Sequence, residues 1–591
     1  MHKFIGLDTE TVKTRHTHNG ETVFVHDFYS FQLFSEDYEL LNNGHFKSNT
    51  VFSTNPEDFL KFLTTKFNKA LFVTFNLAFD GVVICRMLKN RGFQVSFVLA
   101  GSRIIRMTIR RGKLKWVLMD LKNLLPIGSL EKVGEVLKIP KMGKPSYLGE
   151  RKPESLQEKR YFEEYAIRDA EICFKGAKMV YEEFGVFKTT CAGLAIRVFR
   201  GNISGKPEYN FCAFKKFGHL NDSVTEKFRF AYHGGRTECF IRGVNVEDIG
   251  GYDINSLYPY VMQTKEYPFV MKKYKHKYNV DLEYFGLANC TVKVDDDFPL
   301  LCTKKTLDDG IEKLVFPNGT FQGWFTYAEL KEMENSNTGK IVKVNEAYEW
   351  QNDKSLEFKP FKKYVDYFYA KKQQAVLDEN PKVKLYKIML NGLYGKFGEH
   401  GAVRFLNMDG DFILSDNLAR DRKAWYHSVV LAAYITAYAR IENWKILKNC
   451  NPQKLYYTDT DSFYTSENLK NLISKKIGAL KIEDTAKRGR ACFIRSKFYM
   501  FNDDVIMKGF QVKEGSAQIK MSIYENDFIR AEHRILKTLE AKRLGKIPLT
   551  DCQIYKEFSV EEDGKRQFQK HLTPQTLLFE RAFSKPLILE M

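Results

Sequence analysis

Two acidic residues separated by one position occur in the stretch Tyr457-Thr458-Asp459-Thr460-Asp461-Ser462. Aromatic and β-branched residues on both sides are typical of two strands joined by a tight turn. On extended backbone, side chains at i and i+2 point to the same side, so the two carboxylates would lie close together. Two such charges about 4 Å apart repel by roughly 4 kcal/mol at an effective dielectric near 20. A divalent cation held by oxygen ligands would cancel this repulsion, although a solvated hairpin turn has the same composition.

A second group of acids lies in the N-terminal third of the chain. Its members are Asp8, Glu10, Asp80 and Asp169. The first two follow a short strand expected over residues 3–7, the third lies near the start of a helix expected over residues 81–89, and the fourth lies on an amphipathic helix expected over residues 163–180. Tyr165 precedes Asp169 by one helical turn and shares its face. Each carboxylate alone is typical of a solvated surface, but the set lies at strand ends and on one helix of an α/β unit.

The segment Tyr252–Pro259 combines a strand that ends at Asp253 with a helix that begins near Ser256. A carboxylate at a strand end, beside the backbone N–H groups of a helix start, can serve a metal and a triphosphate together. A strand-to-helix turn with a capping acid would explain the segment alone.

Two helices are expected over residues 364–396, separated near Asn380-Pro381. On the second helix, Lys387, Asn391 and Tyr394 fall on one face at i, i+4 and i+7. Lysine suits a triphosphate, and tyrosine suits stacking on a base. The polar side of an ordinary amphipathic helix is the structural alternative.

Two shorter motifs suit phosphate contacts. Tyr232, Gly234 and Gly235 follow a linker-like region, residues 188–226, and paired glycines allow a backbone to approach a phosphate chain closely. A glycine turn between strands is the alternative. Residues 496–499 are expected as a strand on which Lys497 and Tyr499 share a face that can hold a phosphate.

The composition favours a polyanionic partner. The chain has 591 residues, 44% of them hydrophobic, a formal net charge of +19 and a pI near 9.2. Nucleic acid is the first expectation and an anionic membrane the second, while a merely basic protein is the plain alternative. The 10 cysteines include no CxxC pair and indicate reduced thiols in a cytoplasmic protein. The longest apolar run, residues 429–439, is too short to cross a bilayer, and the N-terminus has no signal-peptide pattern.

Together the motifs resemble two linked enzyme families. The pieces DTE, NLAFD and YAIRD resemble the DxE, NxxFD-like and YxxxD motifs of DEDD-type 3′–5′ exonucleases. The later pieces YDINSLYP, KIMLNGLYG, YTDTDS and KFY resemble the motifs of family B DNA polymerases in their usual order. The YHGG piece and two insertions resemble the protein-primed branch of phages and linear plasmids. Two departures are Gly392, where serine is usual, and His233 within the YxGG-like motif.

This resemblance implies an α/β and α+β multidomain fold, with a ribonuclease H-like exonuclease domain followed by a right-hand polymerase domain of palm, fingers and thumb. The expected divisions are the exonuclease (1–187), the first part of the palm (188–260), an insertion like terminal-protein region 1 (261–363), the fingers (364–398), an insertion like terminal-protein region 2 (399–427), the second part of the palm (428–514) and the thumb (515–591).

The resemblance also implies roles in polymerisation. Asp253, Asp459 and Asp461 would bind two Mg²⁺ ions, with Mn²⁺ as an alternative metal. Lys387 would offset phosphate charge, with Lys371 or Lys372 as a second contact. The other residues expected to bind nucleotide, primer or template are Ser256, Leu257, Tyr258, Asn391, Tyr394, Lys497, Tyr499, Tyr232, Gly234 and Gly235. Tyr258 would lie under the sugar and exclude a 2′-OH group.

In the exonuclease, Asp8, Glu10, Asp80 and Asp169 would hold two metal ions. Tyr165 would orient the attacking water, while Asn76 and Phe79 would grip the 3′-terminal nucleotide. Thr11 and Tyr147 are further candidates for single-strand contacts. Either Lys141 or Lys144 would neutralise the phosphate.

The expected partners are a DNA template and primer, dNTPs and a terminal protein whose hydroxyl accepts the first nucleotide. A monomer in the cytoplasm, or in the host cytoplasm for a viral protein, with no membrane association, is expected. Three alternatives remain: a family B polymerase that extends ordinary primers, a nuclease whose C-terminal part only binds DNA, and a non-enzymatic DNA-binding protein.

Overall fold

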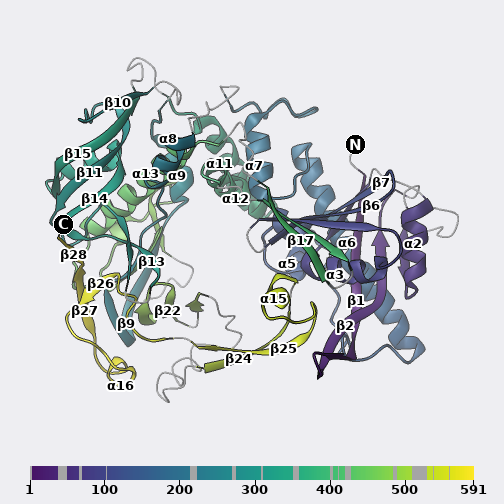
Figure 1. The fold of residues 1–591 in the computed structure, drawn as a ribbon. Coiled ribbons are helices and arrows are strands. Elements are labelled where there is room, and N and C mark those ends of the chain that lie inside the picture. The colour runs from purple at the N-terminus through teal and green to yellow at the C-terminus, as the bar shows by residue number, and fades with distance from the viewer. Residues whose placement is uncertain are drawn as a thin grey trace.

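The computed structural model describes residues 3–37, 41, 49–65, 70–100, 103–212, 222–268, 274–307, 310–350, 358–399, 403–409, 412–419, 427–482, 489–502, 504–508, 529–536, 538–557 and 559–590. Within these ranges no helix combines the length and the apolar character needed to span a bilayer. The elements form an N-terminal unit around one mixed sheet and a larger unit around two further sheets (Figure 1).

The sheet of the N-terminal unit holds the first group of acids. Its strands, in spatial order, are β17 (Phe412–Ala419), β16 (Val403–Asp409), β5 (Gln94–Ala100), β6 (Arg103–Arg111), β7 (Leu114–Asp120), β4 (Leu71–Thr74), β1 (Phe4–His18), β2 (Glu21–Phe34) and β3 (Thr50–Ser53). The short strand predicted over residues 3–7 is wrong in length, because β1 continues to His18 and pairs with β2 throughout. The polar residues after Asp8 lie in a long hairpin rather than in a loop.

Helices cover both faces of this sheet. They are α2 (Pro56–Thr65), α3 (Leu77–Leu88), α4 (Leu121–Leu124), α5 (Leu130–Val136) and α6 (Leu156–Phe184). Along β1, Ile5 packs in one buried cluster with residues of α3, whereas Phe4 packs in another with residues of α6. Because side chains alternate along a strand, Asp8 and Glu10 share the α6 side with Phe4.

The larger unit is built on a sheet that carries the second group of acids. Its strands, in spatial order, are β23 (Asp504–Met507), β22 (Phe498–Phe501), β21 (Gly489–Arg495), β9 (Ile241–Ile254), β19 (Ser462–Thr465), β18 (Leu455–Asp459) and β8 (Thr237–Cys239), with β20 (Leu480–Ile482) and β27 (Ala582–Pro586) also on β9 and β26 (Arg566–Phe568) on β27. A neighbouring sheet comprises β10 (Lys275–Lys277), β15 (Gly339–Trp350), β11 (Phe285–Val294), β14 (Asn318–Thr326) and β28 (Ile588–Leu589). Two hairpins are separate, β12 (Thr303–Thr306) with β13 (Glu312–Val315) and β24 (Ile529–Ile535) with β25 (Asp551–Glu557).

Helices surround these sheets. They are α7 (Cys191–Arg200), α8 (Asp222–Arg229), α9 (Leu257–Thr264), α10 (Tyr327–Asn335), α11 (Lys362–Leu377), α12 (Val383–Gly392), α13 (Val429–Lys448), α15 (Thr538–Arg543) and α16 (Pro574–Leu577), with short 3₁₀ turns η1 (Tyr394–Lys396) and η2 (Lys470–Leu472). The two helices predicted over residues 364–396 are confirmed as α11 and α12. The apolar run over residues 429–439 lies in α13, at whose start the Ser428 hydroxyl accepts the amide of Leu431 at 3.4 Å.

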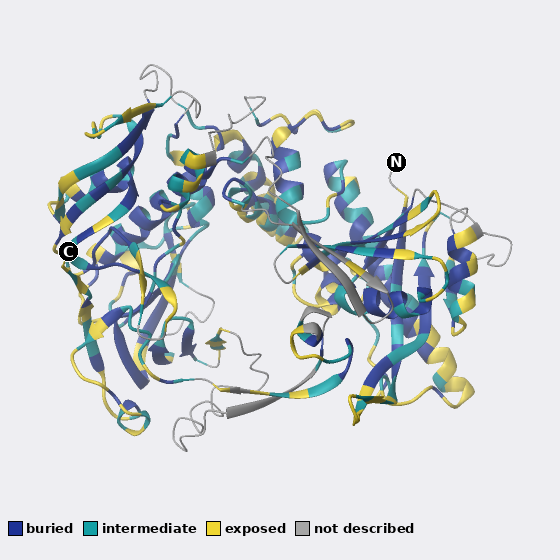
Figure 2. Cartoon of the chain, viewed as in Figure 1, coloured by how far each residue is buried: buried dark blue, intermediate teal, exposed yellow. Residues whose placement is uncertain are grey.

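One buried hydrophobic cluster runs through both units, from Phe4 and α6 to the strands around the second acid group (Figure 2). The helix α7 lies within this cluster and buries Leu194, Val198 and Phe199. The interpretation of residues 188–226 as linker-like is therefore wrong for this part, because apolar residues at helical spacing bury one face of α7.

The units also meet at two further places. Within the insertion expected over residues 399–427, β16 and β17 form a hairpin, and β16 pairs antiparallel with β5 of the N-terminal sheet. The C-terminal part reaches the same unit, where Thr550 bridges to Val25 and Leu549 enters the core of α3. The later strands β27 and β28 return to the larger unit (Figure 1).

Candidate active sites

The acidic turn, Asp459–Ser462, joins β18 to β19 as the sequence predicts. Thr460 has left-handed backbone with a φ of 67°. Asp459 pairs in register with Ser462, and Ser462 pairs in register with Asp253 on β9. Side chains in one cross-strand row point to the same face. Asp253 and Asp459 therefore face one side of the sheet, and the Asp461 carbonyl, which accepts the Ile254 amide at 2.7 Å, fixes the turn beside them.

Residues outside the two strands also hold the acidic turn in place. The Thr460 amide donates to the Arg236 carbonyl at 2.7 Å, and the Asn443 side chain on α13 donates to the Thr460 carbonyl at 3.1 Å. Gly235 packs directly on this turn, because a Cβ there would lie 2.6 Å from Thr460 Cγ2. A Cβ at Gly234 would meet open space. Gly235 thus has a packing role that its sequence did not indicate, while Gly234 is exposed.

Arg440 was missed by the sequence reasoning. It is buried on α13, where its Nη1 donates to the carbonyls of His233 at 2.8 Å and Gly234 at 3.0 Å. Its Nε and Nη2 donate to Glu329 Oε1 of α10 at 3.0 and 2.7 Å. This arginine therefore fixes the YHGG segment that supports the acidic turn. The one signal in the sequence is that Arg440 places a charge directly after the long apolar run of residues 429–439.

The strand predicted over residues 496–499 is wrong in its first half. Ser496 and Lys497 form the turn between β21 and β22, and Lys497 has a φ of 60°. The Lys497 ammonium donates to Asp459 Oδ1, whereas Tyr499 is buried with its ring 4.5 Å from that of Tyr457. The two side chains therefore do not share an exposed face, because the turn rotates Lys497 toward the acids.

Two tyrosines stack beside Asp461. Tyr258 on α9 and Tyr394 on η1 lie with ring centroids 4.1 Å apart and an interplanar angle of 12°. Burial raises the pKa of both phenols, and the nearby Asp461 carboxylate adds to the rise. Ser256 before α9 is left-handed, with a φ of 56°. Leu257 is buried, so it can offer only its backbone to a substrate.

Helix α12 presents Lys387 and Asn391 on an exposed face. The helix ends at Gly392, so Tyr394 lies on η1 rather than on the same helix as predicted. A Cβ at Gly392 would meet Ala192 and Ala195 at 3.6 Å, an ordinary contact. The usual serine would therefore fit here, and its replacement by glycine leaves the packing unchanged.

Lys371 and Lys372 were both candidates for a second phosphate contact, and the groups near their ammonium groups distinguish them. The Lys371 ammonium lies 5.8 Å from the ring of Tyr367. Burial lowers the pKa of Lys372, the positive charge of Lys387 lowers it further, and the Asp253 carboxylate opposes the change. Lys372 is thus the lysine that lies near the acids.

The first group of acids gathers between β1 and α6. Oxygens of Asp8, Glu10 and Asp169 lie within 4.8 Å of one another, and within the described ranges this is the one such cluster of three metal-ligating side chains. The close approach depends on Gly6, since a Cβ there would lie 1.9 Å from the Ala170 carbonyl oxygen. Asp80 stands beside the cluster, where its Oδ1 accepts the Thr9 amide at 3.1 Å and hydroxyl at 2.8 Å.

This crowding changes the acidity of the cluster. Burial raises the pKa of Asp8 well above its usual range, and the neighbouring acids add to the rise. Burial and Asp169 raise the pKa of Glu10 to about 8, and burial raises that of Asp80 to about 7. Burial also raises the pKa of Asp169. Because the four carboxyl groups resist ionising together, a positive charge beside them is needed to keep them ionised.

Lys141 supplies part of that charge. Its ammonium donates to Asp169 Oδ2 and lies 5.0 Å from the ring centroid of Tyr165. Although burial opposes it, the Asp169 carboxylate raises the pKa of Lys141. Burial and the acids raise the pKa of Tyr165, so its phenol stays protonated. Of the two candidate lysines, Lys141 is therefore the one that enters the cluster.

Three of the remaining candidates are held by polar neighbours. Asn76 is left-handed, with a φ of 75°, and its amide donates to Asp120 Oδ1 at 3.0 Å. Asp120 was not identified as functional from the sequence, yet it fixes the loop that carries Asn76 and leads to Phe79. Thr11 Oγ1 lies 3.2 Å from His26 Nδ1. Tyr147 donates to the Glu158 carbonyl at 3.1 Å.

The N-terminal acid group fits divalent cations, whereas the second group offers carboxylates without a cluster of three close ligands among the described residues. In the N-terminal group, Asp169 Oδ1 is buried and has no hydrogen-bond partner among the described residues. An orphaned carboxylate oxygen in a crowded all-oxygen donor set is what Mg²⁺ or Mn²⁺ would satisfy. In the second group, the row of Asp253 and Asp459 with Asp461 alongside offers the same ligand type.

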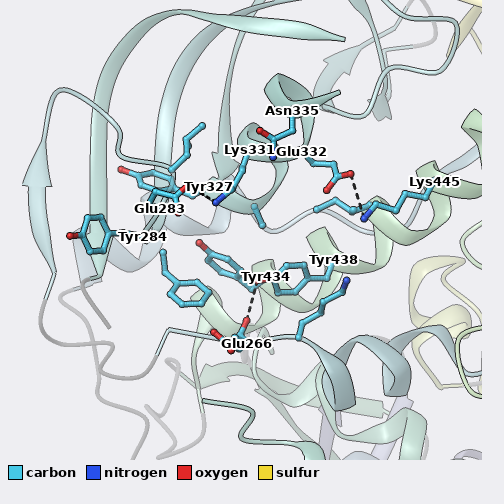
Figure 3. A pocket seen from close by; sticks show the side chains of 15 residues that line it. Glu266, Glu283, Tyr284, Tyr327, Lys331, Glu332, Asn335, Tyr434, Tyr438 and Lys445 are labelled. Atoms are coloured by element: carbon cyan, nitrogen blue, oxygen red, sulfur yellow. Dashed lines mark hydrogen bonds and ion pairs between the residues drawn. The ribbon is translucent and has the colours of Figure 1, made fainter. Parts of the chain in front are cut away.

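A pocket of about 460 Å³ lies apart from both acid groups, between α10, α13 and the start of β11 (Figure 3). Two ion pairs join side chains that line it. The Lys331 ammonium lies 2.7 Å from Glu283 Oε1, and that of Lys445 lies 3.4 Å from Glu332 Oε1.

Comparisons with known proteins agree with this geometry. Residues 150–477 match the family described as DNA polymerase type B, organellar and viral. A probable DNA polymerase of Podospora anserina is 28% identical over 373 residues, covering 52% of this chain and 30% of that protein. The DNA polymerase of Bacillus phage phi29 is 26% identical over 499 residues, covering 76% of this chain and 81% of that protein. The chain thus spans less than a third of the fungal relative.

A solved structure of phi29 DNA polymerase with primer-template DNA and incoming nucleotide substrates superposes with a TM-score of 0.70 at 18% identity. It covers 95% of this chain and 100% of that chain. This likeness confirms the expected fold class, a mixed α/β multidomain chain with the fold of phi29 DNA polymerase.

Proposed function

Because this chain belongs to the organellar and viral type B DNA polymerases, we propose that it is a template-directed DNA polymerase that carries its own 3′–5′ exonuclease. The observation that carries this proposal is the cross-strand row of Asp253, Ser462 and Asp459, with Asp461 at its turn and the stacked tyrosines beside it. A nuclease that only binds DNA with its C-terminal part has no need of a nucleotide-sized set of acids, lysines and aromatic rings.

In the polymerase site, Asp253, Asp459 and Asp461 hold divalent cations. Two Mg²⁺ ions, or Mn²⁺, would lower the pKa of the primer hydroxyl and neutralise the triphosphate when bound. Lys387 and Lys372 bind the phosphates from α12 and α11, and Asn391 lies on the same face of α12 as Lys387. Lys497 holds Asp459 in place from the opposite side and lies where the primer-terminal phosphate arrives.

The nucleotide lies against the stacked pair. Tyr258 supports the sugar and Tyr394 the base, while the loop from Tyr232 to Gly234 follows the template or primer backbone. The low acidity of both buried phenols keeps them neutral, so they act by shape and stacking rather than by charge.

In the exonuclease site, Asp8, Glu10, Asp80 and Asp169 hold the metals. Tyr165 stays protonated and orients the attacking water through its hydroxyl, while Lys141 neutralises the phosphate of the leaving nucleotide. Asn76 and Phe79 hold the 3′ end, with Thr11 beside them.

Both activities can be tested on one primed template in Mg²⁺. The wild-type chain should extend the primer and, without dNTPs, degrade it from its 3′ end. Asp461→Asn should lower extension by about 100-fold or more and spare degradation, whereas Asp8→Ala with Glu10→Ala should abolish degradation and spare extension. A wild-type chain that degrades but never extends would favour the nuclease alternative.

We further propose that synthesis starts on a protein. The support is the position of two insertions: the sheet of β10, β11, β14 and β15 between α9 and α11, and the hairpin of β16 and β17 between α12 and α13. A family B polymerase that extends only ordinary primers is the alternative.

A labelling assay separates the two. The protein is incubated with the candidate terminal protein encoded beside it and one labelled dNTP at a time, without nucleic-acid primer. Label transferred to a protein hydroxyl supports protein priming, and label that appears only on added DNA primers supports the alternative.

A further inference from the structure

Residues 475–482 flank the polymerase acids, although no motif marks them. The Gly478 amide donates to the Asn255 carbonyl at 2.8 Å, and the Asn255 amide donates to the Ala479 carbonyl at 2.9 Å. The Asn255 side chain donates to the Lys476 carbonyl at 3.2 Å. These bonds fix the segment against the loop between β9 and α9, just before it pairs with β9 as β20.

This pairing places Lys481 directly opposite Asp253 in the antiparallel ladder. Directly opposed side chains lie on the same face of a sheet. The Lys481 ammonium lies 3.7 Å from Asp253 Oδ1, and half of the side chain is exposed. Its backbone is therefore fixed in the ladder, while its ammonium lies beside Asp253 and is accessible to solvent.

Two other lysines converge on the same place. After burial, the positive charges of Lys387 and Lys481 lower the pKa of Lys372, and Asp253 opposes them. Lys372 of α11 is thus within electrostatic reach of the lysines of α12 and β20 and of the Asp253 carboxylate, to which Lys481 lies closest at 3.7 Å. Like charges gathered in this way repel, and a polyphosphate is a ligand that removes the repulsion.

We propose that Lys481 is a further substrate-binding residue, which contacts the triphosphate of the incoming nucleotide and the pyrophosphate that leaves. The proposal rests on the proposed polymerase function. A cation bound by Asp253 leaves that carboxylate no spare negative charge for Lys481, so the ammonium moves to the nearest remaining anion, the polyphosphate. None of the motifs identified in the sequence covers this segment, which lies between the acidic turn and Lys497, so its sequence gave no signal.

The test compares Lys481→Ala and Lys481→Arg with Lys476→Ala, an exposed lysine of the same segment that contributes its carbonyl. Three quantities are measured: KM and kcat for a dNTP, KM for pyrophosphate in the reverse reaction, and the Kd of a dNTP in Ca²⁺ for the complex with a dideoxy-terminated primer. Lys481→Ala should raise both KM values and the Kd about tenfold, the size of one charge-assisted contact, with kcat within about threefold. Lys481→Arg should restore most of the loss, and Lys476→Ala should match the wild type.

The proposal is overturned if Lys481→Ala leaves the dNTP and pyrophosphate constants unchanged and shifts only the Mg²⁺ requirement. Lys481 would then be a counter-ion of Asp253. Should the alanine variant fail to fold, Lys481→Gln keeps most of the alkyl stem and carries the same expectation. A wild-type chain that does not extend primers refutes the polymerase function itself, whereas an active wild type with an indifferent Lys481 refutes this inference alone.

Discussion

Replacing Gly235 by alanine should impair polymerisation through the acidic turn alone. The new Cβ would lie 2.6 Å from Thr460 Cγ2, about 0.8 Å closer than the 3.4 Å at which ordinary contact begins. Thr460 cannot easily withdraw, because its amide and its carbonyl are held by Arg236 and Asn443 at 2.7 and 3.1 Å. The strain should destabilise the folded protein by about 1–3 kcal/mol. It acts on Thr460, the residue between Asp459 and Asp461.

A displacement of this size at reacting groups lowers rates by between about 10-fold and 100-fold. We therefore expect Gly235→Ala to lower kcat for extension by that factor, as measured by single-nucleotide incorporation on a primed template. Degradation of single-stranded DNA by the same preparation should stay at the wild-type rate, because the exonuclease acids belong to another sheet.

Thr460→Gly provides the decisive second variant. It removes the atoms that collide, and it relieves a left-handed threonine, worth about 1 kcal/mol. The double variant should recover most of the lost kcat. Gly234→Ala is the matched control, since its Cβ meets open space, and it should affect KM for DNA rather than kcat. A Gly235→Ala variant that extends primers at the wild-type rate would refute this account of the turn. So would a double variant that is as slow as the single variant and has an unchanged Tm.

Two further predictions follow from the burial of titratable groups and from the stacked tyrosines. Folding raises the pKa of Glu10 from 4.5 to about 8, so without divalent cations its contribution to stability is full below about pH 4.5 and is lost as the pH rises through about 8. The Tm gained on adding Mg²⁺ should therefore grow between about pH 6 and about pH 9, and an equal gain in Asp8→Ala with Glu10→Ala would contradict a metal site there. Tyr258→Val should lower discrimination against ribonucleotides by about tenfold or more, measured as the ratio of kcat/KM for dNTP and rNTP, and an unchanged ratio would show that another side chain senses the 2′ position.

The sequence predicted the parts of each site that depend on local periodicity. The turn between two strands that carries Asp459 and Asp461 is kept, although Asp461 lies in the turn itself, and Tyr165 and Asp169 lie one turn apart on one helix. The separation of α11 from α12 near Asn380 follows from a proline, which acts locally as well.

The predictions that were wrong or incomplete concern features that depend on contacts between segments distant in the sequence. The length of β1 depends on its pairing with β2, and the direction of Lys497 depends on a left-handed turn that strand alternation does not anticipate. The choice of Lys141 over Lys144 depends on where α6 places Asp169. Arg440 and Lys481 act through partners more than 100 residues away, so no local pattern could identify them.

The pairing of β16 with β5 limits how this enzyme can be dissected. The division near residue 187 suggests that the polymerase could be produced alone by deleting the exonuclease. That deletion would expose the edge of β16 as a row of unpaired amides and carbonyls, a template for aggregation. It would also expose Leu549, now buried in the exonuclease core. An exonuclease-free enzyme is better obtained by point substitution at Asp8 and Glu10 than by truncation.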